Sequence, residues 1–265
     1  MPNPFRLLAP KPRTLLRDTL EVALADGRRI AIARVRNPRA RRLRLSVDER
    51  GARLTLPLRA SLAAADRFLA EHRDWLAGQL DACAGDAAQP LVPGATTSLP
   101  LRGDAVPLRW IRGRLHRITQ ATDALASGIG LAFETPARAS AAATTRALRD
   151  FYEAEGRRDV ARWLCGYLPG LPRPPSRIVF KRMSSQWGSL APDATLVLDL
   201  SLVLAPSPAF EYVLVHELCH LLHADHSPAF WREVEARYPA WRTQRAWFQA
   251  EGRRLKARLH ALLSA

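Results

Sequence analysis

The stretch VHELCHLLHADHSPAFW, residues 215–231, decides how this chain is interpreted, because it holds four of the seven histidines. His216 and His220 are four residues apart, so a helix places both imidazoles on one face. Glu217 completes the pattern His-Glu-x-x-His, in which two imidazoles bind a zinc ion and the glutamate acts as general base. We predict that His216 and His220 bind a metal ion and that Glu217 is the catalytic residue.

Two further histidines compete for the place of the third ligand. His223 stays on the face of His216 and His220 if the helix continues. A helix rises about 1.5 Å per residue, which puts His223 about 10 Å along the axis from His216. One ion with bonds of about 2 Å cannot reach both side chains. His223 is therefore predicted to be a bystander, or to support a ligand without touching the metal.

Cap-type residues predict that the helix ends before His226. Asp225 and Ser227 favour helix ends, and Pro228 suits the first position of a new helix. A turn over residues 224–227 can bring His226 back to the metal, so we predict His226 as the third ligand. The alternatives are two carboxylates on the next helix, Glu233 and Glu235.

Three protein ligands leave a fourth position for water, which is typical of catalytic zinc sites, whereas structural sites are closed by four protein ligands. Zn2+ is the predicted cofactor, although a histidine-rich site also suits Mn, Fe or Ni. Zinc makes water reactive near neutral pH, and Glu217 would take the proton of that water. The pattern therefore predicts a zinc-dependent metallohydrolase.

The composition favours a folded, basic protein. The chain has 265 residues, of which 48% are hydrophobic, enough for one large domain or two modest ones. The formal net charge is +15, and only three of the 40 basic residues are Lys. We predict either a solvated basic surface or an anionic partner attracted to it. The arginines at 34, 36, 39, 41, 42 and 44 could hold phosphates, but no aromatic residue interleaves them for base stacking.

The sequence predicts a cytoplasmic protein without a membrane span. No uncharged run of 18 or more predominantly apolar residues is present. The start, MPNPFRLLAPKPRTLL, breaks its apolar residues with Pro, Arg and Lys, which is unlike a secretory signal. The three cysteines are too few and too scattered for a disulfide framework or a cysteine-based zinc site, and they are expected to be reduced thiols: Cys83, Cys165 and Cys219.

Residues 1–136 are predicted to form a β-rich N-terminal region with one helix. Alternating apolar residues indicate two hairpins within 19–58, one around Asp26-Gly27 and one around DERG at 48–51. The helix is expected over 61–80, where apolar residues share a stripe. A linker rich in Pro, Gly, Ala and Thr over 84–98 and short strands over 99–103, 106–111 and 129–134 complete this region.

Residues 137–265 are predicted to form a zincin-like metallohydrolase domain, in which the His-Glu-x-x-His helix lies next to a small sheet. The expected fold class is therefore α+β. The helix begins at Ser207 as N-cap and Pro208 as first helical residue. The other expected elements are helices over 138–168, 228–237 and 240–262, a strand over 176–183, and a strand running into an apolar turn over 195–205.

Three further motifs resemble a known family. They are RMSSQWGSL at 182–190, LVLAPSPAFEYVLVHELCHL at 202–221, and DHSPAFW at 225–231. Their order and spacing resemble the YgjP-like metallopeptidase domain family, whose members have a zincin fold and are related to SprT-like and gluzincin peptidases. The strands and helix expected within residues 36–76 also resemble the family, so the likeness covers most of the chain.

The resemblance implies a metallopeptidase with His216, His220 and His226 as zinc ligands and Glu217 as base. Two positions depart from the family pattern: Gln186 stands where a basic residue is frequent, and Leu190 stands where a cysteine is frequent. The element Trp187-Gly188-Ser189 is either a loop that faces the substrate or a structural turn. Arg182 is expected to be a surface residue and Tyr212 a packing residue, with contacts to an anionic group or an oxyanion as the alternatives.

Two other functions stay open beside the peptidase. The positive charge also suits hydrolysis of a phosphoanhydride, such as a nucleoside triphosphate. A basic nucleic-acid-binding protein with a structural metal site is the third alternative. The predicted substrate is thus a peptide or a nucleotide, and a fourth protein ligand would favour the structural metal.

Overall fold

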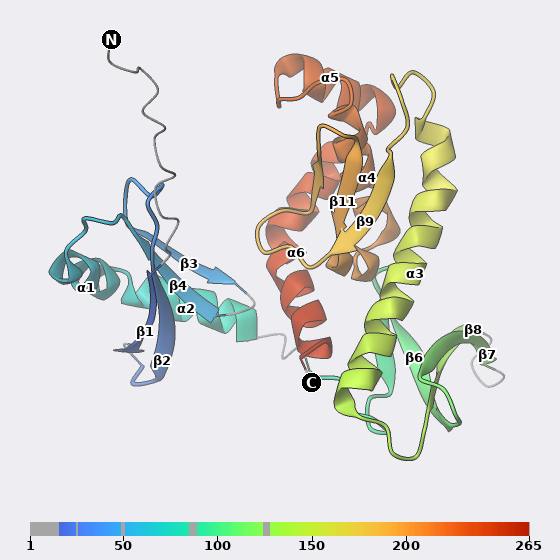
Figure 1. The fold of residues 1–265 in the computed structure, drawn as a ribbon, viewed down its shortest axis with the longest axis horizontal. Coiled ribbons are helices and arrows are strands. Elements are labelled where there is room, and N and C mark those ends of the chain that lie inside the picture. Colours follow the sequence, from blue (N-terminus) through green and yellow to red (C-terminus); the bar gives the residue numbers. More distant parts are fainter. Residues whose placement is uncertain (1–15, 25, 49–50, 85–88, 124–127, 265) are drawn as a thin grey trace, which may run out of the picture. The chain divides into compact units, whose positions relative to one another are not determined.

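The computed structural model describes residues 16–24, 26–48, 51–84, 89–123 and 128–264. The N-terminal segment, predicted not to be a secretory signal, lies almost wholly outside these ranges. The chain divides into two compact units, here called unit 1 (Met1–Asp86) and unit 2 (Ala87–Ala265). The described residues contain six α-helices and three small sheets, so the α+β class is confirmed (Figure 1).

Unit 1 contains a four-stranded sheet of order β1-β2-β4-β3. Both predicted hairpins are confirmed, because β1 pairs antiparallel with β2 and β3 with β4. The turn residues 25 and 49–50 lie outside the described residues. The parallel pairing of β2 with β4, which joins the two hairpins, was not predicted. The strands are β1 (Leu16–Ala23), β2 (Arg29–Arg36), β3 (Arg44–Asp48) and β4 (Gly51–Leu56).

The single helix expected over 61–80 is wrong, because the chain forms two helices, α1 (Leu62–Glu71) and α2 (Arg73–Ala84). The break is at His72. Its backbone N–H donates to Leu69 O, and its ring Nδ1 donates to Phe68 O at 2.8 Å, the carbonyl that a continuing α-helix would offer to the backbone N–H. The side chain thus replaces one helical hydrogen bond.

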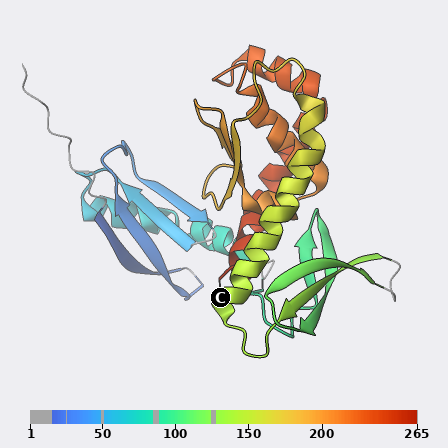
Figure 2. The ribbon, with the colours of Figure 1, turned by 45° about the vertical axis from the view of Figure 1, so that its right-hand side comes forward.

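Both helices of unit 1 pack against the same face of its sheet (Figure 2). Alternate strand residues meet the apolar side of the helices, as period-two patterning predicts. The buried cluster includes Val22, Ile32, Leu54 and Leu56 from the strands and Ala65, Leu69 and Leu76 from the helices.

Unit 2 begins with a second sheet of order β5-β6-β8-β7. The strands β5, β6 and β8 were predicted, although their first and last residues differ from the predicted ones. The strand β7 was missed because the stretch RITQATD has a single large apolar residue, Ile118, which is buried. The strands are β5 (Ser98–Leu101), β6 (Asp104–Arg112), β7 (Arg117–Asp123) and β8 (Gly128–Thr135).

The rest of unit 2 is built around a 27-residue helix, α3 (Ala141–Tyr167), and a third sheet of order β10-β11-β9. In that sheet β9 runs parallel to β11, and β10 runs antiparallel to it. The strands are β9 (Arg177–Lys181), β10 (Gly188–Leu190) and β11 (Thr195–Asp199).

The apolar turn predicted after β11 is a 3-10 helix, η1 (Leu200–Leu204), whose residues are all buried. The next helix, α4 (Ser207–Cys219), begins one residue earlier than predicted, with Pro206 at the N-cap. The helix α5 (Pro228–Arg237) starts at the predicted residue, and Ser227 caps it by accepting the N–H of Phe230. The last helix is α6 (Trp241–Leu262).

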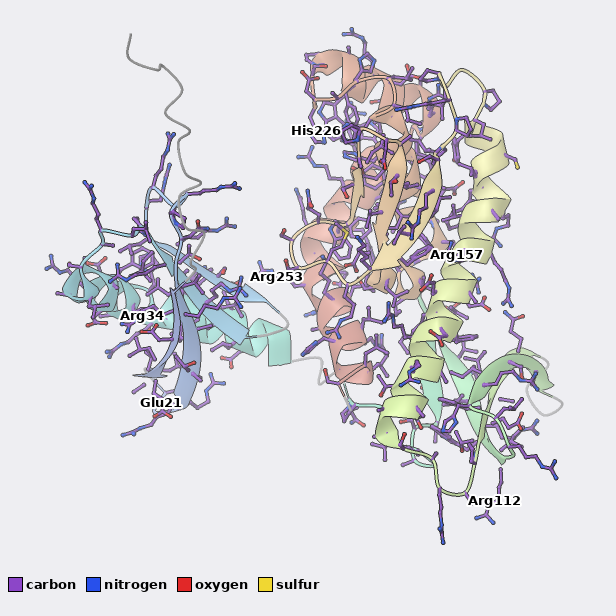
Figure 3. The ribbon with its side chains drawn as sticks, in the orientation of Figure 1. Glu21, Arg34, Arg112, Arg157, His226 and Arg253 are labelled. Atoms are coloured by element: carbon purple, nitrogen blue, oxygen red, sulfur yellow. The ribbon has the colours of Figure 1, made fainter. Side chains whose placement is uncertain are left out.

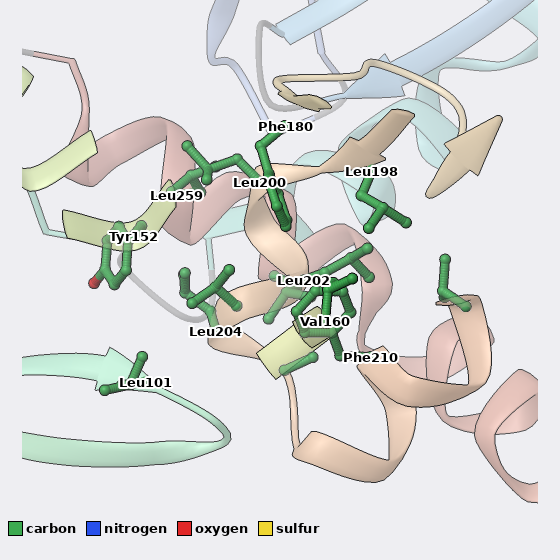
Figure 4. Close-up of a cluster of buried hydrophobic side chains, with 14 of the residues drawn as sticks. Leu101, Tyr152, Val160, Phe180, Leu198, Leu200, Leu202, Leu204, Phe210 and Leu259 are labelled. Atoms are coloured by element: carbon green, nitrogen blue, oxygen red, sulfur yellow. The ribbon is translucent and has the colours of Figure 1, made fainter. Parts of the chain in front are cut away.

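One apolar core holds unit 2 together (Figure 4). It joins Leu101 of the second sheet to Val160 of α3, Leu202 of η1 and Phe210 of α4. Because β5–β8 share this core with α3, the division into units falls at residues 86/87, whereas the predicted domain boundary was at 136/137. No helix among the described residues has both the length and the apolar character needed to cross a bilayer.

Candidate metal centre

The helix α4 carries the first two histidines of the predicted site. His216 lies in the last turn of α4, and His220 is its C-cap, still in helical conformation. The spacing of four therefore holds across the end of the helix, and their ring centroids lie 5.2 Å apart. The chain then turns, and His226 lies between α4 and α5 (Figure 3).

The turn brings His226 back to the two helical imidazoles. The Nε2 atoms of His226 and His216 are 3.1 Å apart. One ring nitrogen from each of His216, His220 and His226 lies within 4.8 Å of the other two. Within the described part of the chain, this is the one group of potential ligands that converges in this way.

His223 contributes its backbone and not its ring to this cluster. The Nδ1 of His220 donates a hydrogen bond to the carbonyl of His223 at 2.9 Å. A metal-binding histidine commonly donates its other ring N–H to a carbonyl or carboxylate, which fixes the tautomer. The bond leaves the Nε2 lone pair of His220 available for a metal.

The alternative carboxylates are engaged elsewhere. Glu233 accepts a hydrogen bond from Arg237 Nε at 2.8 Å. Glu235 accepts from Trp241 Nε1 at 2.8 Å and from Arg242 at 2.7 Å. Neither belongs to the converging group.

Aromatic side chains hold the three imidazoles in place. Phe230 is fully buried, and its ring centroid lies 4.5 Å from that of His220 and 4.9 Å from those of His216 and His226. Trp231 stacks on His226 at 5.8 Å. These contacts were not predicted, although the pair Phe-Trp stands in the quoted stretch.

Glu217 lies against the backbone of β10. A Cβ atom on Gly188 would be 2.6 Å from the Glu217 Cγ and 2.7 Å from its Oε1, closer than such atoms approach. Only glycine at position 188 leaves room for this carboxylate. The contact explains why the Trp-Gly-Ser element has glycine in its middle position. The Glu217 side chain is buried but lines a cavity.

Burial controls the ionisation of these groups. It raises the pKa of Glu217 to about 8. Burial, together with the neighbouring imidazoles of His220 and His226, lowers the pKa of His216 to about 3. Burial also lowers the pKa of His226. Neutral imidazole is the form that binds metal ions, so His216 is held in the ligand form.

A buried ion pair supports the loop before β10. Lys256 Nζ donates to the carbonyls of Met183 and Gln186 at 2.7 and 2.8 Å, and lies 3.7 Å from Asp199 Oδ2. The same carboxylate oxygen accepts the Met183 N–H at 2.6 Å. Lys256 also lies 4.5 Å over the ring of Trp187. The predicted Trp187 turn is thus anchored to β11 and α6, and it lines the cavity as well.

The cavity beside the histidines has a volume of ≈ 800 Å³. Tyr212 lines it, and so do two arginines that were not predicted, Arg173 and Arg245. Arg245 lies 5.2 Å over the Trp231 ring. Arg182 does not line the cavity, because its guanidinium contacts His260. Arg173 and Arg245 are separated from the histidine motif in sequence, so only the fold could reveal them.

The strand β10 presents a free edge to the same cavity. It pairs with β11 on one side and, within the described residues, with no strand on the other. The N–H of Asp199 donates to Trp187 O, and the N–H of Ala191 donates to Thr195 O. Trp187 and Ala191 therefore point their backbone groups toward the neighbouring strand segment. In an antiparallel ladder alternate residues point their N–H and C=O groups outward. Those of Gly188 and Leu190 therefore face away from β11.

The three histidines fit a metal ion. Zinc–nitrogen bonds of about 2.0–2.1 Å put tetrahedral ligand nitrogens about 3.4 Å apart, close to the 3.1 Å between the Nε2 atoms of His216 and His226. The buried Nδ1 of His216 has no partner within the described chain. Three neutral nitrogen donors without a carboxylate suit a borderline ion such as zinc.

Comparisons with known proteins agree with the motif. A model of the YgjP-like metallopeptidase domain matches residues 41–251. The solved metallopeptidase zymogen abylysin of Pyrococcus abyssi matches 38% of this chain and 92% of its own chain at 23% identity, with a TM-score of 0.29. No curated protein matches the chain.

Proposed function

We propose that this chain, which belongs to the YgjP-like metallopeptidase domain family, is a zinc-dependent metallopeptidase. The observation that carries the proposal is the convergence of three imidazoles beside Glu217 at the wall of one cavity. His216, His220 and His226 would hold the ion. A bound zinc ion polarises a substrate carbonyl and makes water reactive near neutral pH.

Glu217 acts as the general base in this proposal. Its carboxylate borders the cavity beside the three imidazoles and does not belong to the converging group, so it would be placed to act on water bound there. Glu217 takes a proton from the attacking water and delivers it to the nitrogen of the leaving amine. Gly188 keeps the space for the carboxylate, and the His223 carbonyl holds the tautomer of His220.

The free edge of β10 supports a peptide as substrate. An extended peptide can add to a strand edge through main-chain hydrogen bonds. The outward groups of Gly188 and Leu190 would pair with it and lay its backbone past the histidines. We also propose that α4 beside β10 forms the active-site half of a zincin-like arrangement, since Glu217 contacts the first residue of that strand.

A second candidate, hydrolysis of a phosphoanhydride such as a nucleoside triphosphate, is favoured by Arg173 and Arg245 in the same cavity. Arginine binds phosphate with two parallel hydrogen bonds. The same guanidiniums could also bind the carboxylate of a peptide. A purely structural metal calls for four protein ligands, whereas the converging group in the described chain has three.

The test is an activity screen of the zinc-loaded protein with peptides and with nucleoside triphosphates. Glu217→Gln should keep the zinc and the fold and should lower turnover by about 10²–10⁴-fold. Glu251→Gln, which makes the same change on the exposed face of α6, serves as the matched control and should keep full activity. Normal turnover by Glu217→Gln, with zinc confirmed, would eliminate Glu217 as base.

A further inference from the structure

Among the described residues of unit 1, both helices lie on one face of the sheet, and no helix of this unit covers the other face. Leu20, Val22, Ile32, Leu54 and Leu56 point toward α1 and α2. Side chains alternate along a strand, so the residues between them point to the opposite face, here called the open face.

The strand register aligns arginines across the open face. Paired residues of neighbouring strands point to the same side. With strands about 4.8 Å apart, a row across all four spans about 14 Å. One row consists of Arg17, Val35, Thr55 and Arg44, and the next of Thr19, Ala33, Arg53 and Ser46. Arginines therefore mark both ends of the first row and the middle of the second, with small side chains at most positions between them.

The connection from β2 to β3 adds charge at the end of the first row. Asn37 N–H donates to Leu56 O at 2.9 Å, so the connection passes the end of β4 before β3 starts at Arg44. Three exposed arginines lie on it, Arg39, Arg41 and Arg42.

These six arginines form no ion pair with any described residue. The helix-facing Arg34, in contrast, is paired with Asp18, and Arg28 with Asp26 and Asp81. Glu21, on the open face, lies beyond Thr19 toward the other end of the sheet. The free set is Arg17, Arg39, Arg41, Arg42, Arg44 and Arg53.

We propose that the open face binds double-stranded nucleic acid through its phosphate backbone. Arginine matches phosphate with a planar, bidentate fork. The small residues Thr19, Ala33 and Ser46 let a rigid duplex approach the sheet. The two rows contain no aromatic residue on which single-stranded bases could stack. They contain no exposed large apolar residue for a membrane surface either, since the exposed Leu58, Leu62 and Trp75 of unit 1 lie outside the strands.

The experiment measures fluorescence anisotropy of two unrelated 20-base-pair DNA duplexes with the full chain from 50 to 200 mM salt. Both duplexes should bind alike, with affinity falling steeply as salt rises. Arg44→Ser/Arg53→Ser should weaken binding about 10–100-fold at 100 mM salt and reduce the slope of log affinity against log salt by about 2. The readout needs no catalytic activity, so it stands or falls separately from the proposed peptidase.

Arg67→Ser/Arg73→Ser is the matched control, because it removes the same charge from the exposed surface of α1 and α2. It should change the affinity by less than about 3-fold, since long-range attraction is screened at this salt. Equal weakening by both variants overturns the proposal in favour of general charge attraction. Absence of duplex binding at 50 mM salt, tighter binding of the single strand, or binding to phosphatidylserine vesicles without duplex binding overturns it as well.

Discussion

Two cavities of similar size lie in unit 2, and both have buried carboxylates in their walls. The first, ≈ 800 Å³, lies beside the three histidines and Glu217. The second, ≈ 850 Å³, lies between β7 and α3 and is lined by Glu155 and Asp159, which are almost fully buried. Neither volume nor buried charge therefore distinguishes the candidate site.

The partners of the carboxylates do distinguish the two cavities. Arg102 donates to Glu155 at 2.8 Å and to Asp159 at 2.9 Å, and Arg162 donates to Asp159 at 3.0 Å. The Glu217 carboxylate, in contrast, has no hydrogen-bond or ion-pair partner among the described residues, and burial alone raises its pKa. In the second cavity the two carboxylates are neutralised by arginines, although the buried Nε2 of His116 in its wall has no partner among the described residues. An unpaired carboxylate at a cavity wall is available for chemistry, whereas paired carboxylates hold the structure together.

The metal ligands should show the largest effect. His216→Ala should reduce the zinc content from about one ion per chain to almost none, because two remaining ligands bind weakly. His223→Ala is the control and should keep the zinc, since its contribution is a backbone carbonyl. Metal analysis of the purified variants checks this. Loss of zinc in His223→Ala but not in His226→Ala would refute the ligand assignment.

Breaking the ion pairs of the second cavity should affect stability and not catalysis. Arg102→Met leaves two buried carboxylates without their shared partner, and we expect a loss of about 3 kcal/mol in the free energy of unfolding. Zinc content and turnover per folded molecule should not change. Denaturant unfolding and an activity assay measure both. A specific loss of turnover would mean that the second cavity also takes part in the function.

Moving Glu217 should affect catalysis and not metal binding. Gly188→Ala puts a methyl group 2.6–2.8 Å from the Glu217 side chain, which must then move. A displacement of about 1 Å at a reacting group can cost about 10²-fold in rate. Gly166→Ala, where a Cβ meets no atom within 4 Å, is the control and should keep normal turnover. Unchanged turnover in Gly188→Ala would show that this contact does not position the base.

Tyr152 tests whether an unpartnered polar group alone identifies a site. Its hydroxyl is buried and has no partner among the described residues, yet it lines neither cavity. Tyr152→Phe removes this hydroxyl and keeps the ring in the core. We expect the free energy of unfolding to stay the same or rise by up to about 1 kcal/mol. A clear decrease in the free energy of unfolding, measured with denaturant, would show that the Tyr152 hydroxyl has a hydrogen-bond partner. The absence of a visible partner would then not distinguish Glu217 either.

Local patterns predicted most of the elements and a part of the candidate site. Period-two stretches identified the hairpins of unit 1, and the pair Ser227-Pro228 identified the start of α5. The prediction failed where hydrogen bonds that the hydrophobic pattern does not reveal decide the structure. The strand β7 is held by its pairing with β8 rather than by its composition, and the His72 ring donates to the carbonyl of Phe68 and ends the first helix.

The sequence by itself determined which residue types could meet a metal: the spacing of His216 and His220 and the cap residues before Pro228 act within a few residues of the chain. Only the tertiary structure decided what surrounds them. Gly188 touches Glu217, Arg245 borders the cavity, and Lys256 anchors the Trp187 loop, across separations of tens of residues. The physical reason is that helix capping and helical periodicity act within a few residues of the chain, whereas the burial that assembles a cavity depends on the packing of the whole unit.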